Sequence, residues 1–145
     1  MNDLESLYRQ VIMDHYKNPR NKGLKDDESY VTAHIKNPSC GDDITIQSKI
    51  ENGKIVDCRH QGTGCSICCS SASVLSEVVM DKTVEEAMEV CDTYLNMITN
   101  KKYDENVDLE EAQVYEGVKK YPARVKCASI AWRAFKETIE GDSDE

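Results

Sequence analysis

The sequence predicts a single domain in which a short run of β-strands lies among α-helices. Three observations support this fold class. Residues 4–15 carry apolar side chains at helical spacing, residues 44–50 alternate apolar and polar side chains like a half-buried strand, and residues 83–86 form a helix capping box. The predicted domain spans residues 1–145, a length that can bury a core without disulfide bonds.

The first predicted helix is amphipathic. Its apolar stripe follows the i, i+3, i+4, i+7 pattern and ends before Asn18-Pro19, because proline disfavours helix in the residue that precedes it. The stripe consists of Leu4, Leu7, Tyr8, Val11, Ile12 and His15.

Two or three strands follow this helix. Tyr30–Ile35 can form one, Ile44–Ile50 alternates as another, and Ile55–Gln61 returns after Asn52-Gly53, a dipeptide typical of hairpin turns.

The loop of this hairpin decides which residues face the core. A two-residue turn at Asn52-Gly53 pairs Ile50 with Ile55 but turns the rest of the returning strand away from the isoleucines. A three-residue loop that ends at Gly53, with Gly53 in the left-handed conformation, instead aligns alternate residues of the returning strand with the apolar face. We therefore expect the bulged loop, in which the side chains of Val56, Cys58 and His60 point toward the core.

Helices dominate the second half of the chain. A glycine-rich break precedes a helix of small residues from Cys65 to about Val79, and the capping box opens another helix, whose apolar stripe runs from Val84 to Ile98. Residues 100–120 are polar without a firm period, although 109–118 can form short helical turns. The last helix begins near Pro122, and the acidic residues near 139–145 are expected to form a flexible tail.

Composition excludes several classes of function. The net charge of −9, from 27 acidic and 18 basic residues, repels phosphate backbones and argues against nucleic-acid binding. The N-terminal residues do not form a secretory signal, and no apolar run is long enough to span a bilayer. We therefore expect a soluble, cytoplasmic protein that does not bind a membrane.

The cysteines carry the chemical signal. Seven cysteines in a chain without a secretory signal favour metal binding or thiol chemistry over disulfides. Cys40, Cys65 and Cys127 each lie where secondary structure changes, and with Asp42 they could form a tetrahedral zinc site. Gly41 would let the chain fold so that both of its neighbours reach one ion. From spacing alone, a shared metal site and unrelated thiols both remain open.

Local charge favours the thiolate form of two of these cysteines. Cys65 is expected at a helix N-terminus, where unpaired backbone N–H groups stabilise negative charge. Arg124 and Lys126 stand beside Cys127 and would support its thiolate in the same way.

Four ordered motifs resemble the IscU/SufU family of iron–sulfur cluster assembly proteins, which is similar to the N-terminal part of NifU. The resemblance covers roughly residues 4–138. It is carried by Asp14-His15-Tyr16-Lys17-Asn18-Pro19-Arg20-Asn21, Asn37-Pro38-Ser39-Cys40-Gly41-Asp42, Gly62-Thr63-Gly64-Cys65 and Val125-Lys126-Cys127.

Three departures favour the SufU branch over the IscU scaffold branch. The scaffold branch has a histidine where this chain has Lys126, and it lacks the insertion of about twenty residues near 100–120. The chaperone-recognition segment of the scaffold branch is replaced here by Tyr121-Pro122-Ala123-Arg124. The resemblance therefore implies a zinc-dependent sulfurtransferase that accepts sulfur from a pyridoxal-phosphate-dependent cysteine desulfurase of the SufS type.

The resemblance also implies a fold, a site and a mechanism. The fold is α+β, a small antiparallel three-stranded sheet with helices packed on one face. Zn²⁺ is held by Cys40, Asp42, Cys65 and Cys127, and Cys40 is the sulfur acceptor. A histidine of the desulfurase displaces Cys40, which attacks the enzyme's persulfide and later delivers the sulfur to a separate iron–sulfur scaffold. Two alternatives stay open, a [2Fe–2S] scaffold of IscU type on the same ligands and a purely structural zinc module.

The remaining cysteines and histidines are expected to be structural. Cys58 and Cys91 lie on apolar faces and should fill the core. Cys68 and Cys69 share a helix face with Cys65 and should serve close packing, although a resolving thiol is the alternative. No ligand role is expected for His15 or His60, and His34 has no predicted position.

Overall fold

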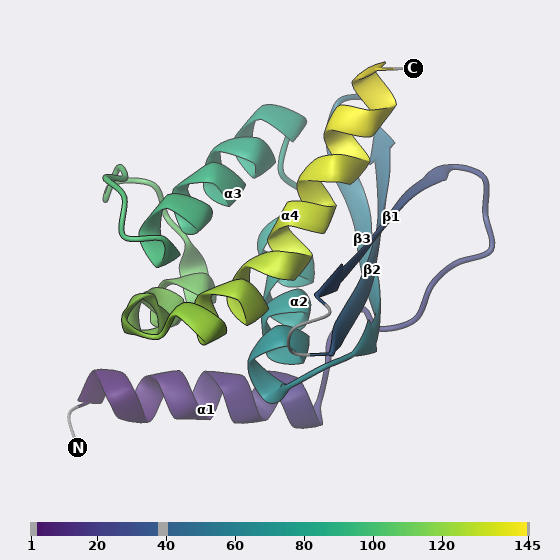
Figure 1. The fold of residues 1–145 in the computed structure, drawn as a ribbon. Coiled ribbons are helices and arrows are strands. Elements are labelled where there is room, and N and C mark those ends of the chain that lie inside the picture. Colours follow the sequence, from purple (N-terminus) through teal and green to yellow (C-terminus); the bar gives the residue numbers. More distant parts are fainter. Residues whose placement is uncertain (1–2, 38–40, 145) are drawn as a thin grey trace.

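The computed structural model describes residues 3–37 and 41–144 (Figure 1). The predicted sulfur acceptor Cys40 lies outside the described residues. In chain order the elements are α1 (Asp3–Lys17), β1 (Tyr30–Asn37), β2 (Asp42–Glu51), β3 (Lys54–Thr63), α2 (Ser66–Val78), α3 (Val84–Ile98), the 3₁₀-helix η1 (Glu110–Lys120) and α4 (Pro122–Asp144).

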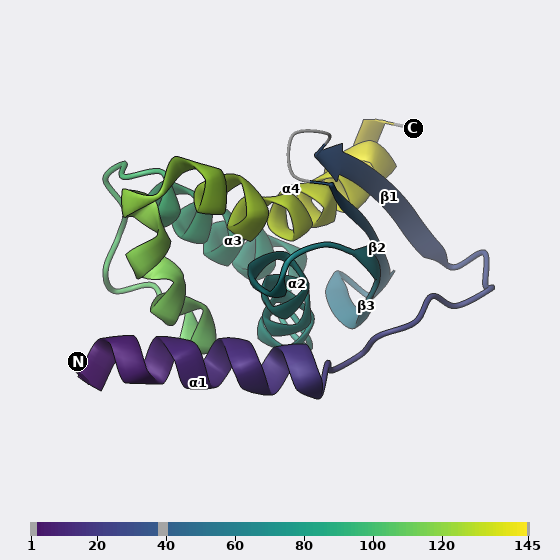
Figure 2. The same ribbon diagram turned by 60° about the horizontal axis from the view of Figure 1, so that its bottom comes forward.

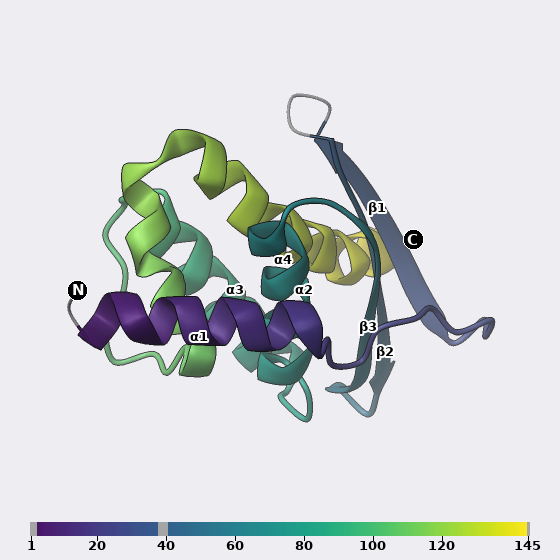
Figure 3. The same ribbon diagram turned by 90° about the horizontal axis from the view of Figure 1, so that it is seen from below.

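The strands and the helices packed on them are arranged as predicted. Its three strands pair antiparallel in the order β1-β2-β3. Helix α4 packs on β1 and β2, and α2 packs on β3. Seen from below, the helices lie on one side of the sheet (Figure 3), and the turned view shows the same arrangement (Figure 2). The prediction of an α+β fold with helices on one face of a three-stranded sheet is confirmed.

The β2–β3 hairpin departs from the predicted register. Asn52 and Gly53 have φ of 53° and 77°, so the loop is a two-residue turn with both residues in the left-handed region, and Ile50 pairs with Ile55. The expected three-residue loop was therefore wrong. The register of the strand pair then shifts, because Lys49 pairs with Asp57. Val56 is therefore the extra residue of a β-bulge in β3.

This bulge within the strand sets the face of the residues after it. Val56 is 37% exposed, contrary to the prediction that it faces inward. Cys58 and His60 are buried as predicted, since one extra residue reverses the alternation.

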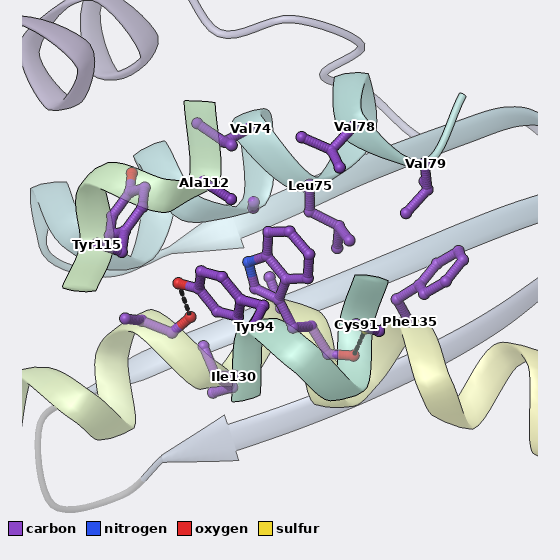
Figure 4. Packing of buried hydrophobic residues seen from close by; sticks show 14 of the residues in the cluster. Val74, Leu75, Val78, Val79, Cys91, Tyr94, Ala112, Tyr115, Ile130 and Phe135 are labelled. Carbon is purple, nitrogen blue, oxygen red and sulfur yellow. Dashed lines mark hydrogen bonds between the residues drawn. The ribbon is translucent and has the colours of Figure 1, made fainter. Parts of the chain in front are cut away.

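The core lies between the sheet and the helices. The rings of Tyr94 and Trp132 stack with centroids 3.9 Å apart, and the indole N–H of Trp132 donates to Ser71 Oγ at 2.8 Å. Figure 4 shows Leu75 of α2, Tyr94 of α3 and Phe135 of α4 in one cluster. Aromatic stacking and satisfied polar groups together specify how the helices pack.

Residues 100–120, predicted as a polar insertion, contribute to this core through η1. The most completely buried residues recur every third position, which is the period of a 3₁₀-helix and explains why no period of 3.6 is found. They are Leu109, Ala112, Tyr115 and Val118. The Tyr115 hydroxyl hydrogen-bonds to Ser70 Oγ at 2.6 Å, so the segment is fixed to α2.

Helix α4 is the longest element described and lies across β1 and β2. It begins at Pro122 as predicted, and it continues to Asp144 through acidic residues for which the sequence predicts a flexible tail. Near its far end the buried Thr138 hydroxyl is 2.8 Å from Ser48 Oγ on β2. In residues 3–37 and 41–144, no helix has both the length and the apolar character that crossing a bilayer requires.

Candidate metal centre

Three of the predicted metal ligands converge at one end of the sheet. Asp42 begins β2, Cys65 is the N-cap of α2, and Cys127 lies in the second turn of α4. A carboxylate oxygen of Asp42 and the two Sγ atoms all lie within 4.8 Å of one another. The fold therefore brings together side chains that are far apart in sequence, while a contact of Cys40 with them remains a prediction.

Asp42 is buried beside the start of α2. It is 1% exposed, and its Oδ1 accepts the backbone N–H of Cys65 at 3.2 Å. A Cβ at Gly64 would lie 2.5 Å from the same oxygen, so only glycine leaves room for the carboxylate there. Sequence reasoning missed this role of Gly64, whose only signal was the glycine-rich break before the helix.

Gly41 has the backbone conformation that its predicted role requires. Its φ of 72° lies in the left-handed region, and its N–H donates to the carbonyl oxygen of Asn37 at 2.9 Å. The chain therefore turns sharply just before Asp42.

Cys65 lies at a helix N-terminus, as predicted. It has extended backbone angles, φ −71° and ψ 169°, and its Sγ accepts the backbone N–H of Cys68 at 3.5 Å. At this position the sulfur accepts one of the backbone N–H groups that the first helical turn leaves without an intrahelical partner. Because Cys65 is exposed, the site is reachable from outside.

Cys127 is buried, like Asp42 and unlike Cys65. Burial raises the pKa of its thiol, and contacts with Asp42 and Cys65 raise that pKa further. Three acidic groups thus meet where only a cation makes their charged forms compatible. Two sulfur donors and one carboxylate oxygen fit a tetrahedral zinc site and leave a fourth position for another ligand.

The two predicted supporting cations take different positions. Arg124 hydrogen-bonds to the Tyr8 hydroxyl and lies 5.7 Å from the ring centroid of Tyr121. Burial raises the pKa of Tyr8 and Arg124 partly offsets this, while Cys65 acts on the same hydroxyl as a neighbouring charge. Arg124 is thus held near the site by α1, whereas the exposed Lys126 lines a groove between α3 and α4.

The remaining cysteines behave as core residues. Cys58, Cys68 and Cys91 are fully buried, and burial raises the pKa of the first and third thiols. Cys69 is half-buried, its pKa is raised by burial and by the charge of Cys65, and its thiol contacts the carbonyl oxygen of Gly64 at 3.7 Å. A raised pKa reduces the thiolate fraction on which thiol reactivity depends.

Two histidines, His60 and His34, have partners outside the group formed by Asp42, Cys65 and Cys127. His60 Nε2 is 2.7 Å from the carbonyl oxygen of Arg20, and burial lowers the pKa of the imidazole. His34, which had no predicted position, is exposed and pairs with Asp43, the neighbour of Asp42.

Comparison with known proteins places the chain in a family. Residues 7–128 match the family described as NifU-like N terminal domain. The zinc-dependent sulfurtransferase SufU of Bacillus subtilis is 40% identical over 137 residues, which cover 94% of this chain and 92% of the relative. The iron–sulfur cluster assembly scaffold protein IscU of Streptococcus pyogenes is 36% identical, with 97% and 87% covered.

Solved structures agree with this assignment. A putative iron–sulfur cluster assembly scaffold protein for the SUF system from Fervidobacterium islandicum superposes with a TM-score of 0.79 at 34% identity, covering 91% of this chain and 96% of that one. The N-terminal part of a NifU-like protein from Brucella abortus shares the fold, with a TM-score of 0.82 at 22% identity and 98% of each chain covered. The chain belongs to the NifU-like N-terminal domain family of iron–sulfur cluster assembly proteins.

Proposed function

We propose that this protein is a zinc-dependent sulfurtransferase that accepts persulfide sulfur from a pyridoxal-phosphate-dependent cysteine desulfurase of the SufS type. The observation that carries the proposal is the convergence of Asp42, Cys65 and Cys127 at an accessible end of the fold. The 40% identity with a relative named zinc-dependent sulfurtransferase supports it. The accepted sulfur would pass to a separate iron–sulfur scaffold.

Four residues would share the zinc, each with a distinct role. The buried Cys127 and Asp42 anchor the ion to α4 and β2, and Cys65 holds it from the N-terminus of α2. Cys40, two residues before Asp42, supplies the fourth ligand and the sulfur-accepting thiol. Bound zinc keeps its cysteine ligands in the thiolate form. Arg124 reduces the excess negative charge that three thiolates and a carboxylate bring to a dication.

The transfer is a thiol–disulfide type of exchange. The Cys40 thiolate attacks the outer sulfur of the persulfide on the desulfurase, a new S–S bond forms, and the desulfurase cysteine leaves as a thiolate. One sulfur atom moves, and no external oxidant or reductant is needed. The exposed position of Cys65 leaves this side of the site open to a second protein.

Mass spectrometry after incubation with the desulfurase and cysteine tests the proposal. We expect an adduct of about 32 Da, one sulfur atom, on Cys40, and no transfer to Cys40→Ala. Asp42→Ala should weaken zinc binding but keep the nucleophile, because it removes only the oxygen ligand. Lys126→His should leave transfer largely intact. An adduct on Cys65 or Cys127, with Cys40→Ala still active, would refute the assignment.

The second candidate function is an iron–sulfur scaffold on the same ligands. The 36% identity with a relative named scaffold protein favours it. Metal analysis of protein purified without oxygen separates the two. The sulfurtransferase carries one zinc at this site and no visible absorption band, whereas a scaffold shows the brown chromophore of an iron–sulfur cluster.

A further inference from the structure

A second group of metal-ligating side chains converges near the C-terminal end of α2. It consists of His15 near the end of α1, Glu77 at the end of α2, and Glu111 in the first turn of η1. One ligand atom from each lies within 4.8 Å of the other two. These residues come from three segments of the described chain, so only the tertiary fold brings them together.

The distances match a small coordination sphere. His15 Nε2 is 3.3 Å from Glu111 Oε1 and 3.6 Å from Glu77 Oε1. With metal–ligand bonds of about 2.1 Å, these separations correspond to angles of about 105° and about 120° at a central ion, close to tetrahedral. Both separations from His15 are therefore compatible with a divalent ion bound between the imidazole and each carboxylate.

His15 is held as metal-binding histidines are. Its side chain is fully buried, and its Nδ1 lies 2.8 Å from Ser73 Oγ, which also accepts the backbone N–H of Arg20 at 2.9 Å. When Nδ1–H donates to Ser73, Nε2 directs its lone pair at the two carboxylates. A hydrogen bond of this kind from the second ring nitrogen fixes the orientation of an imidazole ligand.

Charge and access also suit a dication. Glu77 and Glu111 are 44% and 50% exposed, so solvent can fill a remaining coordination position. Arg20 balances this charge only in part, because its 2.7 Å ion pair is with Asp14 and its ion pair with Glu77 is longer, 3.9 Å from Nε. A neutral imidazole with two carboxylates balances the charge of a divalent ion, unlike the thiolate-rich centre.

We propose that His15, Glu77 and Glu111 form a second divalent-cation site, with a preference for zinc-class ions. Imidazole and carboxylate donors at these distances suit Zn²⁺ and Co²⁺. The bound ion would join α1, α2 and η1, and so would fasten the 100–120 segment to the N-terminal helix. The site does not depend on the sulfurtransferase function, because none of its ligands belongs to the thiolate centre.

Cobalt titration of the full chain tests the proposal, because Co²⁺ reports its ligands by absorption. Two Co²⁺ ions per chain are expected after equilibrium dialysis, of which only the one at the thiolate centre gives sulfur-to-metal charge transfer. Glu77→Gln/Glu111→Gln should bind the second ion at least about tenfold more weakly and keep the charge-transfer band. The amides retain hydrogen-bond acceptors for His15, so the fold should survive, which far-ultraviolet circular dichroism checks.

The matched control is Glu89→Gln/Glu116→Gln, which removes the same charge from α3 and η1 and should bind two ions. One Co²⁺ per chain together with the charge-transfer band in the wild type would overturn the proposal, as would a second ion that persists unchanged in Glu77→Gln/Glu111→Gln. Loss of the charge-transfer band in the wild type would instead count against the thiolate centre alone, so the two proposals fail separately.

Discussion

Gly64→Ala should weaken zinc binding without removing any ligand. Gly64 is not among the residues with positive φ, so its backbone accepts an L-residue, and the cost of the substitution is steric. The new methyl group would lie 2.5 Å from Asp42 Oδ1 and 3.3 Å from the Cβ of Cys68. Ordinary contact begins near 3.4 Å, so the carboxylate must move by about 0.9 Å.

The size of this displacement sets the expected loss. Metal sites tolerate deviations of about 0.2 Å in ligand distance, so a shift several times larger disrupts coordination. Overpacking of a filled site typically costs about 1–3 kcal/mol, and each 1.4 kcal/mol is tenfold in affinity. Because Asp42 is 1% exposed and also accepts the N–H of Cys65, it has little room to move away. We therefore expect zinc to bind about 10–100-fold more weakly.

Competition with a chromophoric chelator measures this change. Gly117→Ala is the matched control, because a Cβ there meets nothing within 4 Å, and its zinc affinity should equal that of the wild type. A Gly64→Ala protein that is folded and binds zinc within about threefold of wild type would show that Asp42 is not a ligand, or that the contact at Gly64 does not position it.

Three further predictions concern the metal, the neighbouring thiols and pH. Chelation of zinc, or Cys127→Ser, should lower the thermal midpoint by many degrees, because zinc binding contributes roughly 10 kcal/mol at structural sites; an unchanged melting curve after verified zinc loss contradicts this. Cys68→Ala with Cys69→Ser should leave zinc content and sulfur transfer near wild type, and loss of transfer with zinc retained would identify a resolving thiol. Burial lowers the pKa of His60, so the unfolded chain binds a proton that the folded chain does not, and stability should fall as the pH drops below about 6.5 towards the folded pKa. In His60→Gln, denaturant melts across this range should show a shallower pH dependence, and equal slopes in the two proteins would argue against the assignment.

Local signals in the sequence predicted much of the fold. The capping box is present, since Thr83 Oγ accepts the N–H of Glu86 at 3.1 Å and the Glu86 carboxylate accepts the N–H of Thr83 at 3.0 Å. Such contacts join residues within one turn, so the sequence contains all the information that they need. The hairpin register did not follow in the same way. Val56 and Cys58 are both apolar, and hydrophobic pattern alone cannot tell which of them is the extra residue of a bulge.

The candidate site likewise combines local features that the sequence predicts with tertiary contacts that it does not. Cys65 at a helix N-terminus was predicted, because the glycine-rich break before it is local. The contact between Gly64 and Asp42 was not, since it depends on how closely two segments approach after folding. The place of His15 on an apolar stripe predicts its burial, but not that Glu77 and Glu111 approach it from other helices. Tertiary clusters of this kind leave no spacing pattern in the chain.

In the proposed zinc site, the position of Cys127 on α4 would couple metal binding to the packing of a whole helix. Asp42 and Cys65 belong to the sheet and α2, so zinc affinity includes the free energy of holding α4 in place. The coupling is reciprocal: the factor by which bound zinc would stabilise the docking of α4 equals the factor by which that docking would strengthen zinc binding. The hydrogen bond between Ser48 and Thr138 is one term in that docking. It lies six residues along β2 from Asp42, about 20 Å away, yet in the proposed site it would contribute to the affinity for zinc.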